Sequence, residues 1–335
     1  MLIVDSFTSS DSFVSLAKTR VLEKDTENRL RLLNRSLLNG SVSHYYRLKL
    51  LSLNIKWISI FLGAVFTFPI LAGDSLALTT EQACQKISSK LSSVGRKECN
   101  SINLALSGAL SVNQFPILIK EYPPLGDKKP LGRILLIGGT HGDELSSISV
   151  VFKWMNKLEK YHSGKFHWRV MPLLNPDGAL LRKHTRQNAN GVDLNRNFDT
   201  PGAEAQVALD HWKTETNSNK RRYPGPSPLS EPETQWLFNE ISTFKPDVII
   251  SVHAPFSLVD YDAPNRTDAP HRIGYLHKNL MGTYPGSLGN FAGIHLEIPV
   301  ITLELPHAGI MPTNNQITQM WIGIVRWLSR YLKES

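Results

Sequence analysis

Apolar runs and helical spacing alternate along the chain from about residue 79 onward. The apolar runs that predict buried strands cover residues 115–121, 133–138, 166–174, 248–252 and 300–305. Apolar residues recur at three- and four-residue spacing, as in amphipathic helices, over 79–95, 145–158, 230–244 and 316–331. Ser230 and Glu233 have the spacing of a capping box that would begin the third of these helices. The alternation predicts an α/β fold, organised as one domain over residues 78–335.

A single long apolar run lies ahead of this region, at residues 57–72. Basic side chains precede the run and small residues follow it, which is the order of a secretory signal peptide. The alternative is an uncleaved anchor helix, but the 16 residues of the run are fewer than the roughly 20 that span a bilayer. We therefore expect residues 57–77 to hold the apolar segment and cleavage site of a signal peptide, cut after about Ala77.

The export signal would begin unusually far from the first residue. Residues 1–56 are polar, so they are either a leader or the result of a start site assigned too far upstream. Whether residues 1–46 are translated stays open at this point. The mature protein would be periplasmic or secreted, with no stable membrane span after cleavage.

Charge and cysteine content narrow the class of protein further. The net charge is +8, but half of that excess precedes the apolar run, so we expect no nucleic-acid partner. Cys84 and Cys99 are the two cysteines, and both lie in a segment at 78–120 just after the predicted cleavage site. In an exported chain they would form one disulfide, and the alternative is two free buried thiols.

Candidate metal ligands stand at the ends of two predicted strands. His141 and Glu144 belong to a Gly-rich turn, GGTHGDE, that directly follows the strand at 133–138. His253 ends the strand at 248–252. Two imidazoles and one carboxylate are a set that binds zinc in hydrolases, because they leave a fourth position open.

Two further features carry candidate chemistry. Glu304 interrupts the apolar strand at 300–305, where a lone carboxylate is costly unless it acts, for example as a general base for water. Arg186 precedes a loop at 191–198 that holds Asn195 and Arg196. Guanidinium and amide donors at this density favour a clamp for a carboxylate.

Six short segments in order give the chain a resemblance to a known family. They read HGDE, NPDG, RQN, GVDLNRNF, SVH and TLELP and spread over roughly residues 130–310. The chain resembles the zinc metallocarboxypeptidases, the carboxypeptidase-A-like enzymes, and within them the bacterial murein peptide amidase A branch. The resemblance implies a mixed, twisted eight-stranded sheet sandwiched between helices.

The same resemblance implies a role for each candidate in catalysis. One Zn²⁺ per chain would be bound by His141, Glu144 and His253. Glu304 would act as the general base and then pass the proton to the leaving amine. Arg186 would polarise the scissile carbonyl, with Arg182 as the alternative.

It also implies how the substrate is held. Asn195 and Arg196 would bind the carboxylate of the departing residue, and Tyr284 would close over the substrate, with Tyr275 as the fallback. Leu288 would lie near the pocket for the departing side chain. Because no acidic residue stands beside Leu288 in the sequence, a preference for Lys or Arg is not expected.

The implied enzyme is an exported zinc amide hydrolase acting next to a free carboxylate. In the murein branch the bond joins γ-D-glutamate to meso-diaminopimelate, so the partner would be a peptidoglycan-derived peptide. The alternatives are a carboxypeptidase for α-linked peptides and an N-acyl amino acid amidohydrolase of the aspartoacylase or succinylglutamate desuccinylase type. A catalytically inactive wall-binding module on this fold is disfavoured, because all three candidate ligands and Glu304 are present.

Overall fold

The computed structural model describes residues 78–127, 129–204 and 206–334. The predicted leader and signal peptide, residues 1–77, lie outside the described residues. Within the described part of the chain, no helix is long and apolar enough to cross a membrane.

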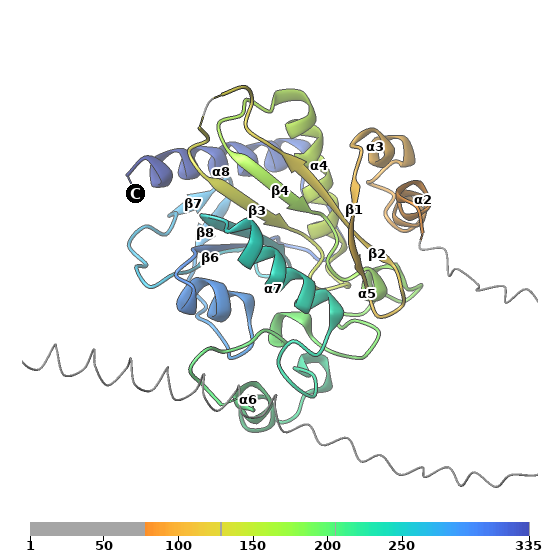
Figure 1. The fold of residues 1–335 in the computed structure, drawn as a ribbon, viewed down its shortest axis with the longest axis vertical. Coiled ribbons are helices and arrows are strands. Elements are labelled where there is room, and N and C mark those ends of the chain that lie inside the picture. Colours follow the sequence, from red (N-terminus) through yellow and green to blue (C-terminus); the bar gives the residue numbers. More distant parts are fainter. Residues whose placement is uncertain (1–77, 128, 205, 335) are drawn as a thin grey trace, which may run out of the picture. The chain divides into compact units, whose positions relative to one another are not determined.

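A mixed sheet runs through the centre of the described region (Figure 1). Its strands are β1 (Ala105–Leu110), β2 (Pro116–Tyr122), β3 (Arg133–Ile137), β4 (His167–Met171), β5 (Val248–His253), β6 (Leu258–Asp262), β7 (Arg272–Ile273), β8 (Leu276–Lys278) and β9 (Val300–Glu304). Their order is β1-β2-β4-β3-β5-β9-β6-β8-β7, and the four strands β4, β3, β5 and β9 are mutually parallel. The α/β class and the mixed sheet are confirmed, but the described sheet has nine strands where eight are expected.

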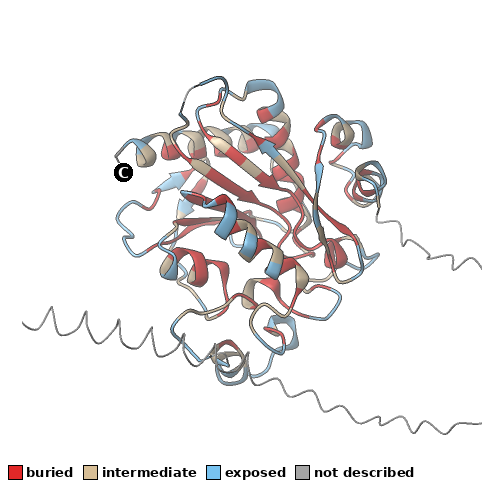
Figure 2. Cartoon of the chain, in the orientation of Figure 1, coloured by how far each residue is buried: buried red, intermediate tan, exposed pale blue. Residues whose placement is uncertain are grey.

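Helices cover both faces of this sheet. They are α2 (Thr80–Lys90), α3 (Arg96–Ser101), α4 (Leu145–Tyr161), α5 (Pro176–Leu180), α6 (Val207–Glu215), α7 (Pro232–Phe244) and α8 (Asn314–Glu334), with short turns η1 (Leu194–Arg196) and η2 (Lys220–Arg222) and a π-helix, η3 (Gly289–His295). The apolar residues of α4 and α8 share one core with one face of the sheet, and those of α7 and η3 share a second core with the other face. The central strands are accordingly buried on both sides (Figure 2).

The parallel strands bring the candidate ligands to one edge of the sheet. β3 leads directly into the turn that holds His141, and β5 ends at His253. β9 is paired in parallel with β5, and the register places Glu304 opposite His253. Ligand sites in α/β sheets form at the carboxyl ends of such strands, because the chain leaves the sheet there and the polar groups converge.

The N-terminal segment is fastened by a covalent bond. A disulfide joins Cys84 of α2 to Cys99 of α3, and both cysteines are fully buried. Ile87 and Ile102 on either side belong to the same apolar core as α4. The bridge therefore joins two short helices that pack on this core.

The capping box expected at Ser230 is wrong. Helix α7 begins at Pro232 with Glu231 as its N-cap residue, and no side chain caps that end. Glu233 instead turns inward and is fully buried, where it accepts hydrogen bonds from the backbone N–H of Val112 and from Nδ2 of Asn188. The carboxylate therefore ties three distant segments together rather than closing its own helix.

Glu233 should make the stability of the fold depend on pH. Burial raises its pKa from 4.5 to about 7, so between these values the folded state binds more protons than the unfolded state. Stability should fall as pH rises through this window, by about 3 kcal/mol for this group. Glu233→Gln should flatten the decline, as measured by urea unfolding at pH 5 and pH 8. An equal decline in wild type and variant would contradict this origin.

Candidate metal centre

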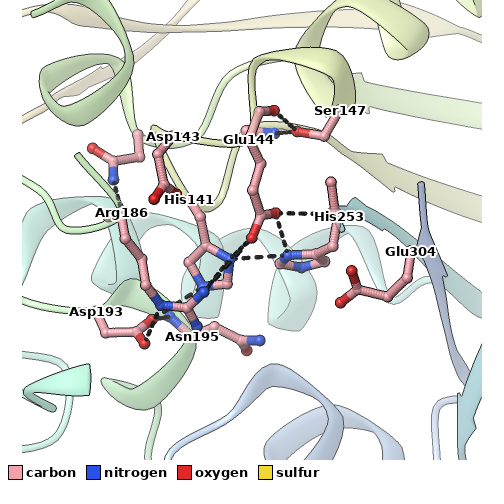
Figure 3. Close-up of polar contacts among 12 residues, drawn as sticks. His141, Asp143, Glu144, Ser147, Arg186, Asp193, Asn195, His253 and Glu304 are labelled. Atoms are coloured by element: carbon pink, nitrogen blue, oxygen red, sulfur yellow. Dashed lines mark hydrogen bonds and ion pairs between the residues drawn. The ribbon is translucent and has the colours of Figure 1, made fainter. Parts of the chain in front are cut away.

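Three buried side chains converge where β3 and β5 end. His141 Nδ1 lies 2.8 Å from Oε1 of Glu144, and His253 Nδ1 lies 3.0 Å from Oε2 of the same carboxylate. The two ring nitrogens are 3.1 Å apart. Each residue is at most 4% exposed, and their potential ligand atoms lie within 4.8 Å of one another (Figure 3). The set could hold a metal ion.

The turn after β3 forces this arrangement. A Cβ on Gly142 would lie 2.3 Å from the backbone of Gly178, so only glycine lets the two turns approach. Glu144 occupies the N-cap position of α4, and its backbone carbonyl accepts a hydrogen bond from Ser147 Oγ. Close packing of the HGDE turn on the neighbouring NPDG turn therefore fixes both His141 and Glu144.

Asp193 orients His141 from behind. Its Oδ1 lies 3.1 Å from His141 Nε2, and its Oδ2 accepts a 2.8 Å hydrogen bond from Nε of Arg186. Burial would raise the pKa of Asp193, but the charges of Arg186 and His141 hold it well below its ordinary value. The sequence analysis missed this residue, although its place in the GVDLNRNF segment is a usable signal.

The hydrogen-bond pattern at His141 fits a cation in front of it. An ionised Asp193 can only accept, so the hydrogen of the neutral ring belongs on Nε2 and Nδ1 presents a lone pair. That lone pair faces the Glu144 carboxylate, the second ring and the guanidinium of Arg186, so these groups surround a position that suits a cation. Tetrahedral zinc sites space their ligand atoms by about 3.3 Å, close to the separations here.

Arg186 reaches the same place with its guanidinium group. Its Nη1 is 3.1 Å from His141 Nδ1 and 3.6 Å from Oε1 of Glu144, and the side chain lines the pocket. Arg182 is exposed and lies outside the residues that line this pocket. Of the two arginines considered from the sequence, the structure brings Arg186 to the candidate metal centre.

Glu304 stands beside His253 at the end of β9 (Figure 3). It is 6% exposed, and the backbone N–H of Phe256 contacts its Oε2 at 3.5 Å. Burial raises the pKa of Glu304, which suits a carboxyl group that exchanges a proton during a reaction.

The predicted substrate-binding residues lie in the same pocket. Asn195 Oδ1 accepts a 2.9 Å hydrogen bond from the backbone N–H of Leu288, and Nη1 of Arg196 donates to the Asn195 carbonyl at 2.5 Å. The Arg196 guanidinium also stacks 4.6 Å from the ring centre of Tyr284. Tyr275, the fallback, packs against the apolar core outside this pocket.

Two acidic residues that the sequence analysis did not select also line the pocket. Asp260 and Asp262 come from β6 and are 3% and 5% exposed. They share the pocket with Leu288, where no acidic residue is expected from the sequence alone. Strand β6 is absent from the strands expected from the sequence, because its alternation of apolar and acidic residues was not interpreted as a strand.

Comparisons with known proteins agree with this geometry. The profile of the zinc carboxypeptidase family matches residues 120–272. Murein peptide amidase A of Escherichia coli K12 is 29% identical over 203 residues, which cover 58% of this chain and 79% of that protein. Murein peptide amidase A of Vibrio campbellii is 31% identical over 180 residues, 52% of this chain and 69% of that protein.

Solved structures give a similar result. Murein-tripeptide amidase from Escherichia coli O157 is 26% identical, covers 67% of this chain and 89% of that chain, and has a TM-score of 0.46. Carboxypeptidase A from Helicoverpa armigera is 17% identical, with 75% and 72% of the two chains covered and a TM-score of 0.53. The similarity to the Helicoverpa armigera carboxypeptidase A shows that the two proteins share a fold.

Replacing Asp193 by Asn should weaken metal binding without removing a ligand. The amide cannot supply the charge that holds the His141 hydrogen on Nε2, so we expect zinc affinity to fall by about 10- to 100-fold. Competition with a chromophoric chelator measures this directly. Asp199→Asn, in the same loop, is the matched control and should bind zinc like wild type. Equal affinities for the two variants would exclude this role for Asp193.

Proposed function

The chain belongs to the zinc carboxypeptidase family, and we propose that it hydrolyses the bond between γ-D-glutamate and meso-diaminopimelate in peptidoglycan-derived peptides. Its activity class is that of a zinc peptidase or amidase. The substrate is inferred from the relatives, which are named murein peptide amidases. The observation that carries the proposal is one pocket containing the His141–Glu144–His253 cluster, a buried Glu304 and three guanidinium groups.

Zinc is the metal that the donor set favours. His141, Glu144 and His253 would hold one Zn²⁺ per chain, and they leave the pocket side free for substrate. When bound, the ion polarises the amide carbonyl and makes water acidic enough to supply the nucleophile.

Glu304 is the proton carrier in this proposal. It takes the proton from the attacking water and delivers it to the nitrogen of the departing residue, so one carboxyl group serves both halves of the hydrolysis. Its position opposite His253 places it beside the candidate metal centre. The buried environment that raises its pKa makes it a stronger base than an exposed glutamate, which favours removal of the proton from water.

Three donors account for the negative charges of the substrate. Arg186, fixed by Asp193, would stabilise the oxyanion that develops on the carbonyl. Asn195 and Arg196 would bind the free carboxylate of the departing residue. Tyr284 is 38% exposed at the rim and would close over the bound peptide.

An exported location fits the covalent chemistry of the chain. Structural disulfides persist in oxidising compartments such as the periplasm, and Cys84–Cys99 is such a bridge. We propose that residues 57–77 direct export and that the domain at 78–335 acts on peptides outside the cytoplasm.

Changing Glu304 should separate metal binding from turnover. Glu304→Gln should keep zinc and lose at least about 100-fold in kcat, because the amide cannot carry the proton. His141→Ala should lose both. Metal content and release of diaminopimelate from L-Ala-γ-D-Glu-meso-diaminopimelate, followed by mass spectrometry with and without chelator, measure the two effects.

The same assay tests the substrate. A zinc-loaded protein that leaves this peptide intact would refute the γ-D-glutamyl assignment, and α-linked peptides and N-acyl amino acids would be assayed next. A Glu304→Gln variant with unchanged kcat would refute the role of the carboxylate.

A further inference from the structure

The pocket below the candidate metal centre is built from three rows of the sheet. Strands β5, β9 and β6 are neighbours, and their register aligns side chains across all three. The rows on the pocket face are His253–Glu304–Leu258, then Ser251–Thr302–Asp260, then Ile249–Val300–Asp262. Since side chains two residues apart point to the same face, each row lies about 6.6 Å deeper than the one before.

The deeper rows contain polar atoms without partners. Asp262 is 5% exposed, and its Oδ1 has no hydrogen-bond partner among the described residues. The hydroxyl of Ser251, in the middle row, is also buried without a partner. Both residues line the pocket. A buried carboxylate oxygen left unpaired is costly, so the pocket is suited to receive a donor.

Two other buried aspartates have hydrogen-bond partners for their carboxylate oxygens. Asp193 is held by His141 and Arg186. Asp260 accepts hydrogen bonds at Oδ1 from the backbone N–H groups of Tyr261 and Met281. The unpaired oxygen of Asp262 therefore distinguishes it from Asp193 and Asp260.

The π-helix η3 leaves the Asp262 carboxylate open to the pocket. A Cβ on Gly289 would lie 2.0 Å from Asp262 Oδ2, and one on Gly293 would lie 2.5 Å from the Asp262 carbonyl oxygen. Any larger residue at these two positions would displace the strand or cover the carboxylate. The two glycines let the helix pack on β6 while Asp262 still reaches the cavity.

The pocket lining carries both signs of charge. Arg186, Arg196 and Arg222 line it, and so do Asp260 and Asp262, which lie two and four residues along β6 from the row of Glu304. The charge of Arg266 acts on both aspartates, but no ion pair joins it to either in the described structure. A ligand complementary to this pocket carries carboxylate at one end and a cation at the other.

We propose that Asp262, together with Asp260, binds the ammonium group at the end of the departing residue's side chain. The substrates would then be peptides whose departing residue is a diamino acid, such as lysine or diaminopimelate. This inference rests on the proposed function, because it assigns the deep end of the same pocket. An extended lysine side chain carries its ammonium about 6 Å from its Cα, a span similar to the spacing between neighbouring rows of the pocket.

The raised pKa of Asp262 agrees with a site that binds a cation. Burial, followed by the charge of Asp260, raises the pKa of Asp262 to about 7. An ammonium beside it would offset both effects and favour the ionised form.

The test compares lysine with norleucine, which has the same carbon chain without the ammonium. The zinc-loaded, full-length protein is assayed on L-Ala-γ-D-Glu-L-Lys and L-Ala-γ-D-Glu-L-norleucine, and on the corresponding α-linked pair. We expect wild type to prefer lysine in kcat/KM by on the order of 100-fold. Asp262→Asn should lose that preference, because its kcat/KM for the lysine peptide should fall toward its kcat/KM for the norleucine peptide. Asp268→Asn, an exposed aspartate outside this pocket, should behave as wild type.

Binding of free L-lysine and L-norleucine by calorimetry gives a second readout that does not need turnover. A wild type that discriminates in neither assay overturns the proposal even if Asp262→Asn fails to fold, and so does an Asp262→Asn variant that keeps the preference. If the protein prefers lysine over norleucine only in the α-linked peptides, the γ-D-glutamyl assignment is refuted and the ammonium site is supported.

Discussion

The structure depends on bringing two imidazoles and a carboxylate within about 3 Å of one another inside the protein. Such a cluster brings ligand atoms together away from water, which is costly unless a cation or shared protons lie among them. It persists because the sheet, the glycine turn after β3 and the Asp193 hydrogen bond fix each member independently. The fold thus positions the three candidate ligands before a zinc ion binds.

The same sheet edge explains how opposite charges coexist in one pocket. The guanidinium groups come from loops beyond the strand ends, whereas Asp260 and Asp262 come from the body of β6. In the described structure neither Arg186 nor Arg196 forms an ion pair with Asp260 or Asp262, so both remain available for the proposed binding of the substrate carboxylate and oxyanion. In the proposed binding mode, strand register would also set the length of the side chain that fits, because successive rows lie about 6.6 Å apart.

Much of this could be predicted from sequence, for identifiable reasons. Buried parallel strands have continuous apolar runs, so β3, β5 and β9 were evident, and with them the placement of His141, His253 and Glu304 at one edge. The short strands β7 and β8 are too brief to produce a pattern. The capping box failed because Glu233 bonds to distant segments, which local spacing does not reveal.

Strand β6 was not expected from the sequence, and its residues show why. Its sequence, LVDYD, alternates apolar and acidic residues, a pattern normally taken for a strand with one wet face or for a loop. In the structure all five residues are buried, since Val259 and Tyr261 enter the helix-covered core while Asp260 and Asp262 enter the pocket. Acidic residues on a strand with no solvent face must be compensated by something other than water. Asp260 is compensated by backbone N–H groups, and we propose that a ligand cation compensates Asp262, a role that the sequence around Leu288 could not show.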